Sequence, residues 1–211
     1  MQSSASSSPK PPKVLVIADP TSRGQVALPG TRVEKEYINE VIGPVTLLVG
    51  ERATLENVEN EIRTANWVHF ACHGVQNAVY PTKSALLLAG DDILTLEKLA
   101  SLQIPHGELA FLSACQTAKG DVGLPDEAIH LSAGMLVSGY KGVIATMWSV
   151  IDSVAPRIVK DVYQHLKESN MDPREAARAL DLAIQNERNR DNTRTDNDWF
   201  TSWVPFIHLG K

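Results

Sequence analysis

Two apolar segments decide the fold: residues 67–74 read WVHFACHG and residues 109–115 read LAFLSAC. Each is a continuous hydrophobic run, which is typical of a strand buried on both faces of a parallel sheet. Each run also ends on a reactive side chain, His73 (followed by Gly74) and Cys115. Reactive groups of open parallel sheets gather beyond the carboxyl ends of the strands, so we expect His73 and Cys115 to lie together there.

Strand-like and helix-like segments alternate along the rest of the chain. Further strands are expected at residues 13–20 (KVLVIADP, stopped by Asp19-Pro20), 45–50, 85–90, 142–150 and 203–210. Helices are expected at residues 31–41, 54–62 (with Thr54 as the cap), 94–102, 126–138, 152–167 and 173–188. This alternation favours an α/β fold with a mainly parallel sheet that helices cover on both faces.

Composition narrows the class of protein. The 211 residues are 43% hydrophobic, enough for one domain, which we place at residues 13–211 after a disordered Ser/Pro-rich linker at 1–12. The net charge of −5 comes without a basic stripe, which disfavours nucleic acid as a partner. No run of apolar residues is long enough for a membrane span or a secretory signal, and the two cysteines form no disulfide framework. We therefore expect a cytoplasmic protein without a membrane partner.

The pairing of His73 with Cys115 points to nucleophilic catalysis. A thiol of ordinary pKa is only a few per cent thiolate at neutral pH, and a neighbouring imidazole that takes its proton raises the reactive fraction. Gly74 allows a tight turn that can present its backbone N–H, and the N–H of Cys115 can supply a second donor. Two such donors form an oxyanion hole for acyl transfer.

The motifs VHFACHG (68–74), LAFLSACQTAKGD (109–121) and HLSAGMLVSGYKGVIATMWSVID (130–152) resemble the CHAT domain, a caspase-like domain associated with HetF or TPR repeats. The turn LPG at 28–30 with Glu34 and Glu36 after it matches as well. This resemblance to the caspase and separase clan implies a three-layer α/β/α sandwich with a six-stranded sheet. It also implies a cysteine endopeptidase with a His73–Cys115 dyad, a protein or peptide substrate, no cofactor, and control by a sensor module such as TPR repeats.

The sequence departs from some relatives around the nucleophile. The chain lacks the caspase signature, so an aspartate-specific pocket is not supported, and it has Ser113 where metacaspase-like relatives carry Asp, so basic specificity would have to come from other residues. The carboxylates that could face a basic side chain are Asp152 and the cluster Asp121, Asp126 and Glu127, in a pocket with Met147 and Trp148 as walls. These carboxylates have a plainer interpretation as loop or first-turn residues, with Asp126 and Asp152 as possible helix caps.

Other functions are compatible with single features of the chain. A cysteine at a strand end is usually a small buried apolar residue, and Cys72 is expected to face the core. Zinc binding by His69, Cys72, His73 and Cys115 is disfavoured, because alternation puts Cys72 on the face opposite His69. A catalytically inactive scaffold that binds a partner protein is the main alternative. A thiol enzyme acting on a small metabolite ranks last, because no Gly-rich phosphate loop follows the first strand.

Overall fold

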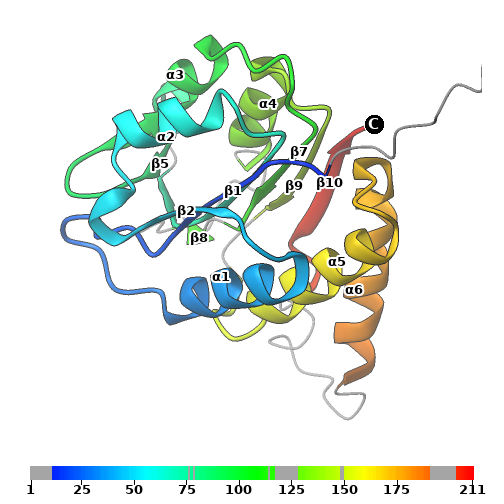
Figure 1. The fold of residues 1–211 in the computed structure, drawn as a ribbon. Helices are drawn as coiled ribbons and strands as arrows, with labels where there is room; N and C mark the ends of the chain where they lie inside the picture. Colours follow the sequence, from blue (N-terminus) through cyan, green and yellow to red (C-terminus); the bar gives the residue numbers. More distant parts are fainter. Residues whose placement is uncertain are drawn as a thin grey trace, which may run out of the picture.

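The computed structural model describes residues 11–75, 77, 79–113, 115–116, 128–147, 150–190 and 203–211. Its centre is a six-stranded sheet of order β10-β9-β7-β3-β1-β2 (Figure 1). All neighbouring strands of this sheet pair in parallel except β10, which is antiparallel to β9. The strands are β1 (Val14–Ala18), β2 (Thr46–Val49), β3 (Trp67–Ala71), β7 (Leu109–Leu112), β9 (Gly142–Thr146) and β10 (Phe206–Gly210). The expected mainly parallel sheet is therefore confirmed.

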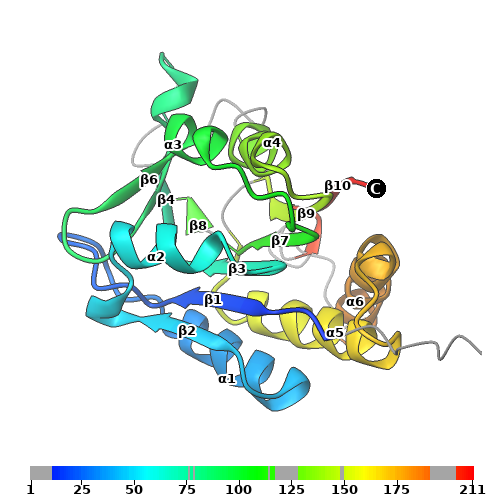
Figure 2. The same ribbon diagram turned by 45° about the horizontal axis from the view of Figure 1, so that its top comes forward.

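Helices cover both faces of this sheet, which completes three layers (Figure 2). One face carries α1 (Pro29–Ile42), α5 (Ala155–Glu168) and α6 (Ala176–Arg190). The other face carries α2 (Leu55–Ile62), α3 (Leu96–Ser101) and α4 (Ala128–Ser138). In the described ranges, no helix is both long and apolar enough to cross a bilayer.

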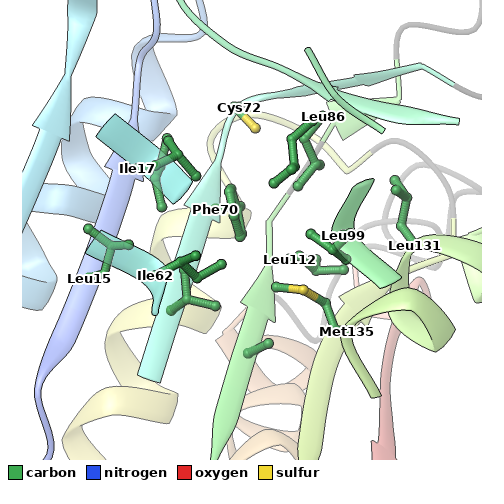
Figure 3. Close-up of a cluster of buried hydrophobic side chains, with 14 of the residues drawn as sticks. Leu15, Ile17, Ile62, Phe70, Cys72, Leu86, Leu99, Leu112, Leu131 and Met135 are labelled. Carbon is green, nitrogen blue, oxygen red and sulfur yellow. The ribbon is translucent and has the colours of Figure 1, made fainter. Parts of the chain in front are cut away.

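The central strands are apolar on both sides because each side meets a helical layer. Every residue of β1, β3, β7 and β9 is buried. On the α2–α4 side, Ile17 and Phe70 pack with Ile62 and Met135, and Figure 3 shows these side chains converging. On the α1–α5 side, the alternate strand residues pack against α5. The sheet thus separates two hydrophobic clusters, and burial of both provides the main drive for folding.

A second, smaller sheet corrects the expected extent of the two motif strands. Its order is β6-β5-β4-β8, from β4 (His73–Val75), β5 (Ala85–Leu87), β6 (Ile93–Thr95) and β8 (Cys115–Gln116). Residues 67–74 and 109–115 were each expected to form one strand, but each is split between the two sheets. The hydrophobic pattern could not show the break, because Cys72 and Ser113, where the strands of the large sheet have ended, are as buried as the strand residues before them.

The two split segments keep one register through the change of sheet. In the large sheet Phe70 pairs with Leu112, and in the small sheet His73 pairs with Cys115. The partners are 42 positions apart in both cases (112 − 70 and 115 − 73). The segments therefore leave the large sheet together, and His73 and Cys115 begin their short strands rather than end long ones.

Several element boundaries also differ from the expected ones. Residues 94–102 begin as strand β6, and Thr95 then caps α3 by accepting a hydrogen bond from the Lys98 N–H. The helix expected at 152–167 begins at Ala155, and the one expected at 173–188 begins with a 3-10 turn at Pro173–Glu175. The cap expected at Thr54 is confirmed, because its hydroxyl accepts from the Asn57 N–H at 3.2 Å.

Replacing Gly30 with alanine should destabilise the fold although Gly30 lies in α1, where alanine is normally favoured. A methyl group at this position would overlap the backbone oxygen and the carboxylate of Asp152, so α1 would have to move from the loop before α5. We expect a loss of about 1–3 kcal/mol in the free energy of unfolding, measured by urea titration. The control Glu36→Ala, at an exposed position of the same helix, should change it by less than about 0.5 kcal/mol.

Candidate active site

The backbone brings the two reactive residues of the sequence side by side. His73 and Cys115 are register partners on the parallel strands β4 and β8, and Gly74 pairs with Gln116 in the next position. β8 thus holds Cys115 next to His73 through main-chain pairing. This juxtaposition was expected from the strand ends, but it occurs in the small sheet.

The imidazole of His73 is held in one orientation by a backbone carbonyl. The ring is buried, and its Nε2 lies 2.7 Å from the carbonyl oxygen of Val26, in the loop between β1 and α1. A carbonyl can only accept, so Nε2 carries the hydrogen and donates it. Nδ1 is also buried and has no hydrogen-bond partner in the part of the chain that the structure describes. In the neutral ring Nδ1 therefore offers a lone pair that can accept a proton.

A cavity of about 220 Å³ opens beside His73. Its wall combines the ends of β1 and β3 with the loop before α1, and its lining residues are Asp19, Pro20, Thr21, Ser22, Gln25, Val26, Ala27, Leu28, Arg32, Ala71, Cys72 and His73. The carboxylate of Asp19 accepts a hydrogen bond from Arg32 Nε at 2.5 Å, so the charges inside the cavity are paired. Such a cavity can receive one side chain of a bound peptide.

A buried polar network lies on the α1–α5 side of the large sheet, below this cavity. Glu34 of α1 accepts a hydrogen bond from the Ser113 hydroxyl at 3.0 Å through one carboxylate oxygen. Its other oxygen lies 2.9 Å from His69 Nε2. The Tyr163 hydroxyl of α5 lies 3.4 Å from His69 Nδ1. All four side chains are buried, and each one contacts another polar group of the network.

The chemistry of these four side chains decides which atoms of the network donate hydrogen bonds and which accept them. An ionised Glu34 can only accept, so Ser113 and His69 Nε2 donate to it. His69 Nδ1 then accepts from Tyr163 when the ring is neutral. Burial raises the pKa of Tyr163, and the charge of Glu34 raises it further, which keeps the phenol protonated as a donor. Sequence reasoning noticed Glu34 and Ser113 only as features of the resemblance, because nothing local in the sequence indicates that they meet.

Of the remaining predicted site residues, the structure describes Met147 and Asp152, and neither lines the cavity beside His73. The carboxylate of Asp152 accepts a hydrogen bond from the Gly30 N–H at 2.9 Å, so it caps α1. The backbone N–H of Met147 donates to the Pro205 carbonyl. Trp148 and Asp121 lie outside the described residues. Their predicted role in a substrate pocket stays a prediction.

Cys72 and His69 face opposite sides of β3, as alternation predicted. Cys72 packs beside Leu86 in the cluster on the α2–α4 side (Figure 3), whereas the His69 ring lies 4.8 Å from that of Phe111 in the other layer. Over the described ranges, no three His, Cys, Asp or Glu side chains converge as ligands of a metal ion.

Comparison with known proteins places this geometry in a family. The family model described as "CHAT domain" matches residues 1–211. The chain belongs to the CHAT domain family. No curated protein sequence matches this CHAT domain significantly.

Solved structures of cysteine proteinases share the fold of this CHAT domain. The Arg-specific cysteine proteinase gingipain R (RgpB) superposes with a TM-score of 0.60 at 13% identity, over 94% of this chain and 46% of gingipain R. A complex of the pro- and mature domains of RgpB from Porphyromonas gingivalis gives a TM-score of 0.60 at 13% identity, over 94% and 47%. A structure described as a protease gives 0.59 at 14% identity, over 94% and 47%. The CHAT domain thus has the caspase-like fold and spans about half the length of these proteinases.

The tautomer of His73 can be tested by NMR. Long-range ¹H–¹⁵N spectra of the neutral ring should show a protonated Nε2 and an unprotonated Nδ1, because the Val26 carbonyl selects that tautomer. The exposed His106 should instead show shifts averaged between the two tautomers. Averaged shifts at His73 would contradict the hydrogen bond to Val26.

Proposed function

We propose that this CHAT domain is a cysteine endopeptidase in which Cys115 is the nucleophile and His73 is the general base. The observation that carries this proposal is the pairing of His73 with Cys115 on adjacent parallel strands, with His73 Nε2 bound to the Val26 carbonyl. Because Nε2 is bound to the Val26 carbonyl, the other ring nitrogen, Nδ1, can accept a proton from a neighbouring thiol. The fold shared with cysteine proteinases supports the same chemistry.

The reaction proceeds through an acyl-enzyme. The Cys115 thiol transfers its proton to His73 Nδ1, and the sulfur forms a bond with the carbonyl carbon of the scissile peptide. The carbon–nitrogen bond then breaks, and the leaving amine takes the proton from Nδ1. Water, deprotonated by His73, hydrolyses the thioester and regenerates the thiol. The N–H groups of Gly74 and Cys115 remain the expected donors to the oxyanion.

The cavity beside His73 is the proposed site for a substrate side chain. His73 and Val26 both line it, so its wall includes the residue that orients the catalytic ring. Because Asp19 is paired with Arg32, the cavity offers no unbalanced charge to a lone basic or acidic side chain. We therefore expect a preference for uncharged side chains at the position that enters it, and control by an attached or partner module remains part of the proposal.

The proposal is tested by labelling with peptides that carry an electrophilic carbonyl group, followed by mass spectrometry of the modified cysteine. Labelling should occur at Cys115, disappear in Cys115→Ala, and slow by about 10²–10⁴-fold in His73→Ala, because general-base assistance is lost. Cys72→Ala removes the other cysteine of the chain. Cys72 also lines the cavity, but it is buried in the cluster on the α2–α4 side, so labelling should stay at Cys115 and still depend on His73.

Two results would contradict the peptidase. Cys115 that reacts no faster than in His73→Ala would show that the histidine does not activate it. A Cys115 that stays unreactive in a folded chain, and also after candidate partner modules are added, would favour the alternative function, a scaffold that binds a partner protein without cutting it. Peptide libraries with charged and uncharged side chains should show in the same assay which residue the cavity prefers.

A further inference from the structure

A single buried side chain, that of Ser113, lies where the chain leaves β7 toward Cys115. Ser113 follows the last residue of β7, and its backbone N–H donates to the Phe70 carbonyl at 2.9 Å, which is the last rung described between the two motif segments in the large sheet. Two residues later Cys115 begins β8 in the small sheet. The change of sheet therefore takes place directly after Ser113.

Within the part of the chain that the structure describes, β8 pairs with β4. It is two residues long, and its described ladder consists of the pairings of Cys115 and Gln116 with β4. A strand this short has no cooperative ladder that fixes its direction. Besides this pairing, the direction in which the chain leaves Ser113 bears on where the Cys115 backbone lies relative to His73.

The Ser113 hydroxyl is held by the carboxylate of Glu34, which is held in turn by His69. The hydroxyl donates to Glu34 at 3.0 Å, and Glu34 is held from its other oxygen by His69, which lies two residues before Ala71 of the cavity wall. Ser113 is 5% exposed and Glu34 is 2% exposed. A buried hydrogen bond to an ionised group is among the stronger ones in proteins, and water cannot replace it at this depth.

We propose that Glu34 is a positioning residue for Cys115, acting by holding the Ser113 hydroxyl and so fixing the path of the chain from β7 into β8. This inference rests on the proposed function, because it assigns Glu34 and Ser113 a part in the reaction of Cys115. Neither residue touches the substrate. They set the distance between the nucleophile and the base, to which acyl transfer is sensitive.

The test compares Ser113→Ala with Ser113→Thr, which keeps the hydroxyl. Ser113→Ala should lower kcat for a peptide substrate about 10- to 100-fold and leave KM nearly unchanged, because misplacing a nucleophile affects the chemical step more than binding. Ser113→Thr should recover most of the loss. Glu34→Gln keeps an acceptor for Ser113 but removes the charge, so it should lower kcat less than Ser113→Ala does.

A matched control is available in another buried serine. Ser138 is 2% exposed, and its hydroxyl donates to the Met135 carbonyl at 2.8 Å at the end of α4. Ser138→Ala removes an equally buried hydroxyl away from the network. It should leave kcat unchanged, and an equal loss in both alanine variants would reduce the role of Ser113 to general stability and overturn the proposal.

Hydrogen exchange separates this inference from the proposed function. Ser113→Ala should speed amide exchange in residues 113–116 and 73–75, and leave β1 and β2 unchanged. Faster exchange there with a Cys115 that never reacts would support positioning by Glu34 and contradict the peptidase. Unchanged exchange and unchanged kcat in Ser113→Ala, with wild-type Cys115 reacting in a His73-dependent way, would overturn the inference and leave the peptidase standing.

Discussion

The shared register of the two motif segments is the constraint on which the rest of the structure depends. β3 and β7 lie in the middle of the large sheet, where helical layers on both faces hold them, and their parallel pairing continues without a shift into β4 and β8. A slip of one residue in this pairing would turn every apolar side chain of β7 to the wrong layer. Burial in the core therefore fixes the register, and the register places Cys115 opposite His73.

The sequence was sufficient for the layers and for the juxtaposition of these two residues. Runs such as residues 109–112 are buried from both sides, and the intervening helices dictate parallel pairing, so the mainly parallel sheet could be predicted. The small sheet could not be predicted from the sequence. Cys72 and Ser113 lie where the chain changes sheet, and they are as buried as the strand residues that precede them. A pattern of apolar residues indicates that a segment is buried, but it does not indicate which strand pairs with that segment.

The hydrogen-bond partners of the site residues could not be predicted from the sequence. The carbonyl that orients His73 belongs to Val26, and any residue type could supply a backbone oxygen there. Asp152 was predicted to serve a substrate pocket from its position after a strand, and nothing local in the sequence indicates that its carboxylate accepts a hydrogen bond from Gly30, 122 positions away. Contacts of this kind depend on how the layers are placed against each other, which local patterns do not contain.

The division into a large and a small sheet has a practical consequence for how variants of this chain are judged. The large sheet with its two helical layers contributes most of the buried apolar area, so it dominates the melting temperature and the circular dichroism of the protein. The small sheet consists of strands of two or three residues, so its ladders hold few of the backbone hydrogen bonds that break on global unfolding, although Leu86 and Leu94 are buried in the core. A variant can therefore keep the Tm of the wild type while its reactive residues have separated. Thermal stability is a poor substitute for a probe placed at β4 and β8 themselves.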